Sequence, residues 1–328
     1  MNLKLKLHEM PPYRPPSEAD SLLIRATRSC PWNKCEFCMM YRGEKFEIKK
    51  VSQIKEDIRI AKDFTSKLKE LSWEYGLGGD LSIIARQSNI PWLSEGCVKT
   101  AFIGDSNSLV MKVDDLREVI NFLYETFPTL KRVTSYARAK TALRRTPEEL
   151  KRLKEAGLSR LHLGLESGDD KVLKYVNKGP TASEMIEAGK KVVSSGISLS
   201  EYIMLGLGGK ERWMQNALGT AKVLNEINPD YIRVRTLMLI PGTPLYDKAK
   251  AGEFEPAQTV EILKEERKLI ENLKVSSFFV SDHIMNYLRV DGKLPEDKEK
   301  MLKSIDDVLS ASPEERERYL QPEELRHL

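Results

Sequence analysis

The sequence has 328 residues, of which 41% are hydrophobic, so it can bury a substantial core in one large or two medium-sized domains. Its 53 basic and 49 acidic side chains leave a net charge of +4, with both signs interspersed, which neither requires nor excludes a nucleic-acid partner. No apolar run reaches the roughly 18 residues of a membrane span, and the N-terminus lacks a signal-peptide stretch. We therefore expect a cytoplasmic protein that makes no contact with a membrane.

Short apolar runs alternate with amphipathic segments along residues 20–250, after an extended, proline-rich lead over 1–19. Strands are predicted at 21–27, 98–104, 132–137, 158–166, 197–206 and 230–240. Helices are predicted at 51–71, 114–127, 146–157, 169–177, 181–196 and 211–227. Two of them open with capping boxes, Thr146–Glu149 and Thr181–Glu184. Strand–helix alternation without hairpin turns predicts an α/β fold with a parallel sheet, either doubly wound or a barrel, with ligands at the carboxyl ends of the strands.

Two segments fall outside this alternation. Residues 72–97 form an insertion with two tryptophans and a glycine cluster, and such an insertion is either a lid or a partner surface. Residues 251–328 form a mostly helical C-terminal extension with one apolar stretch, SSFFVSDHIMNYL, at 276–288. The predicted organisation is therefore a lead over 1–19, a core over 20–250 and an extension over 251–328.

Three of the four cysteines lie within nine residues, in the loop RSCPWNKCEFCMMY at 28–41. A structural zinc site needs a fourth ligand, which would have to come from a distant residue: Cys97, His8, His162, His283 or His327. A redox Cys-x-x-Cys pair would leave Cys30 without a role. A [4Fe–4S] cluster held by three thiolates satisfies the count directly and leaves one iron open, at the mouth of the sheet.

The loop resembles the cluster motif of the radical S-adenosylmethionine (SAM) superfamily, with spacing C-x4-C-x2-C where C-x3-C-x2-C is usual. The resemblance continues over residues 20–250 in FIGDSNSL (102–109), LHLGLESGDDKVLKYVNKG (161–179), YIMLGLGG (202–209) and LIPGTPLY (239–246). The segment 161–179 is similar to oxygen-independent coproporphyrinogen oxidases and methylthiotransferases. The resemblance implies a partial (β/α)6 barrel of radical SAM type. It also implies that reduction of the cluster cleaves SAM to a 5′-deoxyadenosyl radical, which takes a hydrogen atom from the substrate.

The resemblance also implies residue roles. Cys30, Cys35 and Cys38 would be the cluster ligands. Gly104, Asp105 and Ser106 would meet the SAM ammonium group, Glu166 with its neighbour Ser167 the ribose, and Lys178 or Arg138 the SAM carboxylate. The adenine pocket would involve Tyr202, Met204 and Leu239. Each position has a structural alternative: a strand-to-helix turn, a buried strand end, a surface lysine or ordinary core packing.

Three further residues are candidates for catalysis near the radical: Cys97, His283 and Tyr287. Cys97 is otherwise an inert buried thiol, and His283 with Asn286 and Tyr287 otherwise docks the C-terminal extension. The favoured function is a radical SAM enzyme that acts on a small molecule or cofactor precursor, with an electron donor such as ferredoxin or flavodoxin. The alternatives are a radical SAM enzyme that modifies RNA or protein, with nucleic acid the less favoured partner, and a non-catalytic iron–sulfur protein.

Overall fold

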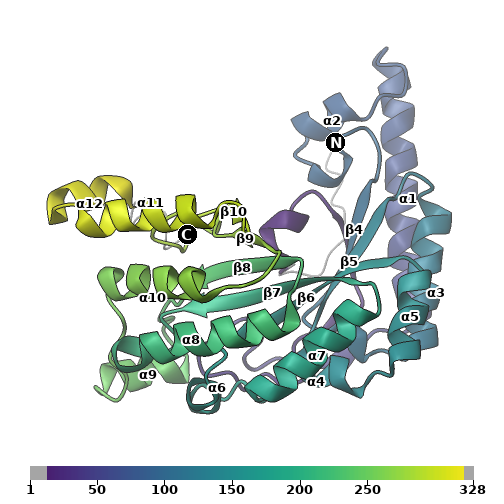
Figure 1. Cartoon of the computed structure of the whole chain (residues 1–328). Helices are drawn as coiled ribbons and strands as arrows, with labels where there is room; N and C mark the ends of the chain where they lie inside the picture. The colour runs from purple at the N-terminus through teal and green to yellow at the C-terminus, as the bar shows by residue number, and fades with distance from the viewer. Residues whose placement is uncertain (1–12, 321–328) are drawn as a thin grey trace.

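A computed structural model describes residues 13–320, and within them one open eight-stranded sheet organises the molecule (Figure 1). The order of its strands follows the chain, from β1 at one edge to β10 at the other. Within this sheet, neighbouring strands in the order β1, β4, β5, β6, β7, β8 and β9 are parallel, and β10 is antiparallel to β9. The strands are β1 (Leu22–Arg25), β4 (Thr100–Gly104), β5 (Arg132–Ala137), β6 (Leu158–Glu166), β7 (Ser198–Leu205), β8 (Tyr231–Thr236), β9 (Phe278–Val280) and β10 (Gly292–Lys293).

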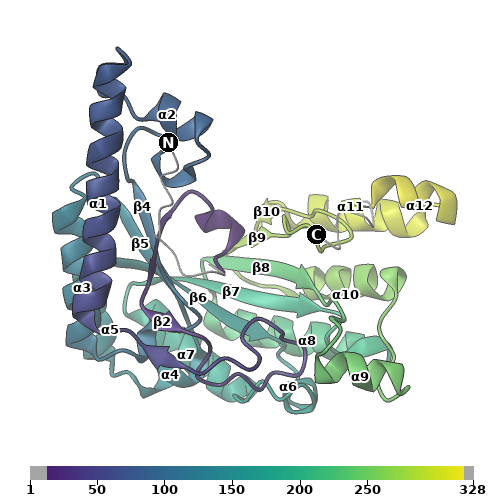
Figure 2. The same cartoon turned by 180° about the vertical axis from the view of Figure 1, so that it is seen from behind.

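Helices connect the parallel strands and cover one face of the sheet (Figures 1 and 2). The α-helices are α1 (Val51–Glu74), α2 (Ser82–Gln87), α3 (Val113–Thr126), α4 (Ala139–Arg144), α5 (Pro147–Glu155), α6 (Asp170–Tyr175), α7 (Ala182–Ser194), α8 (Gly209–Ile227), α9 (Pro244–Lys250), α10 (Thr259–Asn272), α11 (Lys298–Ser310) and α12 (Pro313–Tyr319). Short 3₁₀ turns are η1 (Pro16–Glu18), η2 (Pro91–Leu93) and η3 (Ser108–Val110). The predicted α/β architecture with a mostly helical C-terminal region is confirmed, and the sheet does not close into a full barrel.

Local sequence explains why these helices form where they do. The predicted apolar stripe of α1, from Ile54 to Leu68, is buried, because residues three and four apart share one helix face. Both predicted capping boxes are present, at the start of α5 and of α7: Thr146 and Thr181 accept hydrogen bonds from the backbone amides of Glu149 and Glu184. Burial of these apolar stripes against the sheet builds the core.

The structure departs from the predicted elements in three places. α1 continues to Glu74, beyond the predicted end at 71, and the rest of the 72–97 insertion forms α2 and η2. Trp92 of η2 packs against Phe64 of α1 with ring centroids 6.1 Å apart, so the insertion is fastened to the core. A small second sheet pairs β2 (Thr27–Arg28) with β3 (Glu47–Ile48) on either side of the cysteine loop.

The third departure is that the C-terminal extension supplies strands. Phe279 is buried, and β9 pairs with β8, so the sheet extends past the six predicted strands. Three residues of β9 are too few for strand periodicity to show in the sequence.

The other face of the sheet is concave and receives the segment before β1. Glu18 of η1 is fully buried there and accepts hydrogen bonds from Ser21 and from Arg132 at the start of β5. Its other oxygen lies 3.4 Å from His162 Nε2. Glu18 therefore occupies the amino-terminal end of the concave face. The proposed lead over 1–19 is described from residue 13 onward, and His8 and His327 lie outside the described residues.

The helices within residues 13–320 are all too short or too polar to span a membrane.

Candidate functional site

The three clustered cysteines lie in the loop between β2 and β3, past the carboxyl end of β1. All three are free and half-buried. The amide of Cys38 donates to the carbonyl of Cys35 over 3.2 Å, and the Arg42 guanidinium donates to both carbonyls, over 2.8 Å to Cys35 and 2.9 Å to Cys38. One arginine therefore holds the second and third cysteines in a fixed turn.

The loop is fastened to helices far away in the sequence. Trp32 Nε1 donates to the carbonyl of Asn177 over 2.8 Å, and the Glu36 amide donates to the carbonyl of Val176 over 2.9 Å, both just past α6. On the other side, the Glu36 carboxylate pairs with Lys248 of α9 over 2.5 Å. Figure 2 shows the segment after β2 running along the sheet toward α6 and α9. Contacts on two sides set the position of the cysteines relative to the sheet.

Two cations lie beside these thiols. Arg138, directly after β5, stacks over the Trp32 ring at 5.3 Å and donates to the carbonyl of Lys178 over 3.1 Å. Burial raises the pKa of the Cys35 thiol to about 11, while nearby Lys178 and Arg138 act in the opposite direction. Cys35 and both cations are therefore close enough to interact electrostatically.

Glu166, at the end of β6, faces this group. Lys178 Nζ donates to Glu166 Oε1 over 2.8 Å, and both side chains are largely buried. Glu166 adopts a left-handed backbone conformation with φ of 63°, which is uncommon for a residue with a side chain. A Cβ at Gly164 would lie 2.2 Å from Glu166 Oε1, so only glycine leaves room for the carboxylate to fold back over β6. Ser167 is turned away: its hydroxyl is buried and donates to Asn216 of α8.

The turn after β4 secures the start of the cysteine loop. The buried carboxylate of Asp105 accepts from Arg25 over 2.7 Å, from the Tyr41 hydroxyl over 2.9 Å and from the Ser29 amide over 3.3 Å. Ser106 Oγ donates to the Ser29 carbonyl over 2.9 Å. Burial raises the pKa of Asp105 even though Arg25 opposes that shift. Gly104, Asp105 and Ser106 thus lie beside the cysteines, with the Asp105 carboxylate engaged inside the protein.

Of the three residues predicted for an adenine pocket, Met204 and Leu239 adjoin the cysteine loop. Met204 and Leu239 pack with Phe37 of the cysteine loop against a small apolar cluster. That cluster consists of Val172, Val176, Leu207, Leu245 and Phe254. Tyr202 lies elsewhere, further along the concave face, where its ring is 6.1 Å from that of His162.

The three candidates for catalysis also occupy different places. Cys97 precedes the amino end of β4, whereas Cys30, Cys35 and Cys38 follow the carboxyl end of the parallel strand β1, so the structure does not bring these cysteines together. His283 follows β9, where burial and nearby Arg235 lower its pKa to about 4. Tyr287 packs against the main core.

Asn286, predicted to dock the extension or line the site, is buried and hydrogen-bonds to the end of β8. It accepts from the Thr236 hydroxyl over 3.1 Å and donates to the Val234 carbonyl over 3.0 Å. This side chain ties the loop that carries His283 to the sheet.

The structure adds polar residues that the sequence analysis did not single out: Arg25, Trp32, Arg42, Arg233 and Arg235. Arg25, Trp32 and Arg42 fix the cysteine loop, and only their nearness to the motif could have indicated this. Arg233 and Arg235 left a clearer signal, because charged residues that alternate with apolar ones within a buried strand point to one face.

The donor set fits an iron–sulfur cluster. Three free thiols come from one braced loop, and two cations lie next to them, which suits a cluster that carries thiolate charge. Within residues 13–320, no three histidine, cysteine, aspartate or glutamate side chains are grouped as ligands of a single metal ion.

Residues 24–221, which is more than half of the chain, match the model of the radical SAM superfamily, and the chain belongs to that superfamily. It is therefore an enzyme of this class, whose cofactors are a [4Fe–4S] cluster and SAM.

Among curated relatives, the tRNA uridine(34) acetyltransferase of Methanocaldococcus jannaschii is 25% identical over 118 residues, which cover 36% of this chain and 22% of that protein. The heme chaperone HemW of Bacillus subtilis is 24% identical over 193 residues, 55% of this chain and 50% of the relative. The chain thus spans between about a fifth and a half of the length of these relatives. Among solved structures, N-terminally truncated Elp3 of Methanocaldococcus infernus has a TM-score of 0.49 at 17% identity, covering 71% of this chain and 60% of that one.

Proposed function

We propose that the protein generates a 5′-deoxyadenosyl radical from SAM and uses it to abstract a hydrogen atom from a small molecule or cofactor precursor. The observation that carries this proposal is the convergence of the three thiols with Arg138, Lys178 and Glu166 at the carboxyl ends of β1, β5 and β6. Cluster ligands, carboxylate-binding cations and a hydroxyl-binding carboxylate are the groups that SAM requires.

The cluster, when bound to Cys30, Cys35 and Cys38, supplies the electron that cleaves the sulfonium bond of SAM. The residues of the protein bind and orient SAM. Arg138 and Lys178 are the cations for the SAM carboxylate, and Lys178 also holds Glu166 by its Oε1 atom. Glu166 Oε2 is then directed to the ribose hydroxyls.

The remaining contacts of SAM fall on the two flanking loops. We assign the ammonium group to the backbone carbonyls and Ser106 of the turn after β4, because the Asp105 carboxylate already accepts hydrogen bonds from Arg25, Ser29 and Tyr41. Adenine packs on the apolar side chains of Met204 and Leu239, which lie beside Phe37 of the cysteine loop. The four free cysteines suit a reducing compartment, which we propose is the cytoplasm. The electron that reduces the cluster would come from a ferredoxin- or flavodoxin-type donor.

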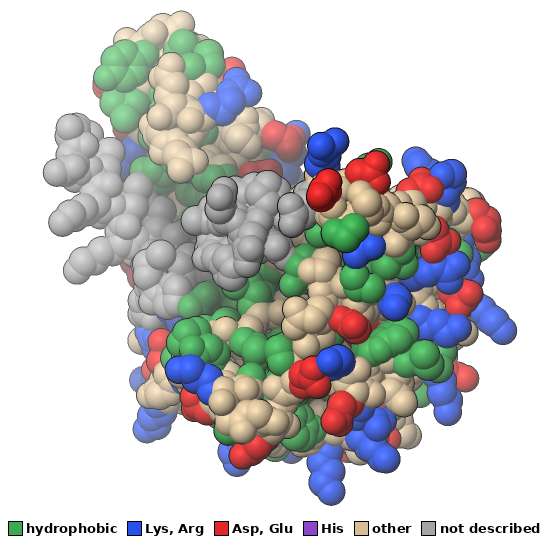
Figure 3. All heavy atoms as spheres, turned by 90° about the vertical axis from the view of Figure 1, so that its left-hand side faces the viewer, with side chains coloured by type: hydrophobic (Ala, Val, Ile, Leu, Met, Phe, Trp, Pro, Cys, Tyr) green, Lys and Arg blue, Asp and Glu red, His purple; other side chains and the backbone are tan. Residues whose placement is uncertain are grey.

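RNA modification is a second candidate. The observation that favours it is the sequence match to tRNA uridine(34) acetyltransferases, although that match spans only 22% of those proteins. On the face at the left of Figure 1, lysine and arginine side chains are interspersed with aspartate and glutamate and form no basic stripe of the kind typical of RNA-binding modules (Figure 3).

The test is dithionite-driven formation of 5′-deoxyadenosine by the anaerobically reconstituted protein. We expect slow formation without substrate and faster formation when the small-molecule fraction of a cell extract is added. Stimulation by the RNA fraction alone would replace the first candidate with the second. Absence of 5′-deoxyadenosine under all conditions would refute both.

A further inference from the structure

Three arginines project onto the concave face of the sheet beyond Tyr202: Arg160 of β6, and Arg233 and Arg235 of β8. Strand register places them on one face, because Tyr202 pairs with Arg233 and Met204 with Arg235 across β7 and β8, and Arg160 is two residues before His162. The Arg160 guanidinium stacks 4.0 Å above the Tyr231 ring, and Arg235 lies 4.9 Å from the Tyr202 ring.

Two of these guanidinium groups, those of Arg233 and Arg235, have a buried nitrogen without a hydrogen-bond partner within residues 13–320, whereas Arg160 Nε donates to the Ser198 hydroxyl over 3.2 Å. Arg233 is only 8% exposed, yet its Nε, like that of Arg235, is buried without a partner among the residues that the structure describes. The nearest carboxylate to Arg233 belongs to Asp282, at 3.8 Å, which is too long for a hydrogen bond. Burying a guanidinium N–H without a hydrogen-bond acceptor is unfavourable, so a further partner is expected.

The acidic residues nearby do not supply that partner. Glu18 is already engaged by Ser21 and Arg132 at the amino end of the concave face. His283, which faces Arg235, has its pKa lowered to about 4 and is neutral at neutral pH. Among the described residues, one carboxylate, that of Asp282, forms an ion pair with the three arginines, so this part of the concave face carries an excess of positive charge.

We infer that Arg233 and Arg235, with Arg160 beside them, bind an oxyanion of the substrate, a carboxylate or a phosphate. This inference rests on the proposed function, whose substrate it assigns to small anionic molecules. Guanidinium groups bind both anions through paired N–H donors. Because Met204 and Arg235 are paired neighbours, an anion held here places the rest of the molecule toward the SAM side of the concave face. An RNA backbone is disfavoured, since Arg233 is too deeply buried for a polymer phosphate to reach.

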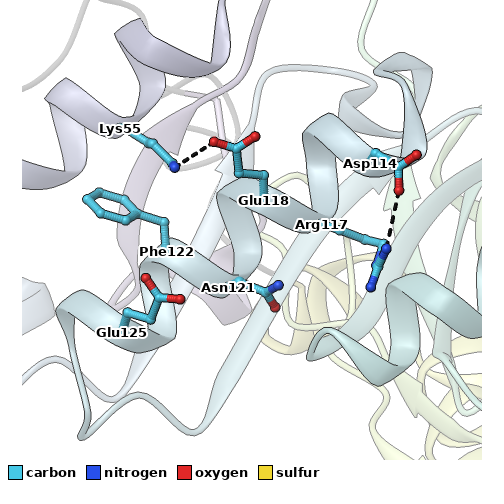
Figure 4. A pocket seen from close by; sticks show the side chains of 7 residues that line it. All are labelled: Lys55, Asp114, Arg117, Glu118, Asn121, Phe122 and Glu125. Atoms are coloured by element: carbon cyan, nitrogen blue, oxygen red, sulfur yellow. Dashed lines mark hydrogen bonds and ion pairs between the residues drawn. The ribbon is translucent and has the colours of Figure 1, made fainter.

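A second charged hollow, on the outer surface between α1 and α3, provides a contrast (Figure 4). There Lys55 pairs with Glu118 over 2.5 Å and Arg117 with Asp114 over 3.2 Å. Arg117 Nε is also buried without a partner in the described part of the chain, but both cations of this hollow contact a carboxylate at hydrogen-bond distance, which Arg233 and Arg235 do not. Arg117→Gln is therefore a matched control, because it removes one arginine from a charged hollow outside the concave face.

The experiment is calorimetric titration of the full-length protein with inorganic phosphate and, separately, with succinate, at ionic strength held constant with chloride. We expect saturable binding of at least one anion, weakened about tenfold or more in Arg235→Gln and Arg233→Gln and unchanged in Arg117→Gln. Preference for phosphate or for succinate distinguishes a phosphorylated substrate from a carboxylic one. Arg235 is less buried than Arg233, so its variant provides the test if Arg233→Gln does not fold; Arg235→Lys, which keeps the charge but loses the paired donors, should bind more weakly than wild type.

The inference would be overturned if no anion bound saturably, or if Arg117→Gln weakened anion binding as much as Arg235→Gln. If an RNA oligonucleotide bound more tightly and displaced the anion, the site would be assigned to RNA instead. Anion binding needs neither cluster nor SAM, so its result is separate from the 5′-deoxyadenosine assay. If the protein cleaves SAM but binds no anion, the proposed function is retained and only the assignment of an anionic substrate is rejected.

Discussion

Glu166 and Lys178 form a buried ion pair that joins two predicted SAM contacts into one unit. Each was predicted separately, and their 2.8 Å contact makes the orientation of the carboxylate depend on the lysine. The left-handed conformation of Glu166 and the space above Gly164 support the same orientation. The pair therefore fixes the carboxylate for which we propose ribose binding, rather than leaving the glutamate free to rotate.

Replacing Lys178 by methionine should destabilise the fold. The change leaves the Glu166 carboxylate buried without its partner, which costs about 3 kcal/mol. Denaturant unfolding should show that loss in Lys178→Met and partial recovery in the double variant Glu166→Gln/Lys178→Met. If the single variant were as stable as wild type, the ion pair would not hold Glu166 in solution.

For single residues, the sequence predicts those whose roles depend on a local motif. It does not predict contacts between residues that are far apart in the chain. Cys30, Cys35 and Cys38 stand in one recognisable loop, and Glu166 and Lys178 share one segment. The carboxylate of Asp105, by contrast, is engaged by Arg25, 80 residues away, and by Tyr41, 64 residues away. No periodicity or spacing indicates such pairings, because they arise only when the strands are aligned.

At the scale of elements, α8 touches the loop after β6 through two glycines. A Cβ on Gly168 would lie 2.2 Å from the carbonyl oxygen of Gly219, and a Cβ on Gly219 would lie 2.8 Å from that of Gly168. The backbones therefore meet without side chains between them. This contact fixes the loop that directly follows Glu166.

Alanine at either glycine should separate these backbones, and the effect should be larger at Gly168. We expect Gly168→Ala to cost about 3 kcal/mol of unfolding free energy. Gly219→Ala should cost less, because the contact is longer and alanine regains about 1 kcal/mol of helix propensity within α8. Equal stability of both variants and wild type in urea unfolding would show that the loop and α8 are not in close contact.

β7 carries a buried carboxyl group, Glu201, whose Oε2 has no hydrogen-bond partner among the residues described. Burial raises its pKa to about 8. The folded protein therefore keeps a proton that the unfolded chain releases near the ordinary glutamate pKa of 4.5. Its stabilising contribution is complete below that value and is lost as the pH rises toward about 8.

The variant Glu201→Gln should remove this pH dependence. The unfolding free energy of wild type relative to the variant should fall by about 1 kcal/mol per pH unit across the interval between the two pKa values. Glu125→Gln, at an exposed glutamate of α3, is the control. A wild-type-minus-variant difference that does not change with pH would mean that Glu201 is ionised in the folded state.

The helices and strands themselves can be predicted where an apolar pattern continues over many residues. The strand predicted at 158–166 matches β6 to the residue, and α1, α7 and α8 differ only at their ends. The strands β9 and β10 were missed because they have three and two residues, and β2 and β3 because two residues each carry no pattern. Their place in the structure depends on the neighbouring strand or on the cysteine loop that they flank.

For the whole molecule, the open sheet explains how the chain joins two kinds of site on one surface. The amino end of the concave face is filled by Glu18, the cysteine loop lies past the carboxyl end of β1, and the arginines of β6 and β8 lie between them. The proposed SAM site and the proposed anion site therefore share the concave face. Alternation within β8 indicates that Arg233 and Arg235 share one face, and the strand register shows that this is the face of Tyr202.

The most direct test of this account is the electron paramagnetic resonance spectrum of the reduced, anaerobically reconstituted protein with and without SAM, together with its iron content. The account predicts about four irons per chain and a spectrum that shifts when SAM is added. Both should be lost in Cys35→Ala, whereas Cys97→Ala, which removes a cysteine at the opposite end of the sheet, should keep its iron. Zinc in place of iron, or a cluster spectrum that SAM leaves unchanged, would contradict the assignment of Cys30, Cys35 and Cys38 as the ligands of a SAM-binding cluster.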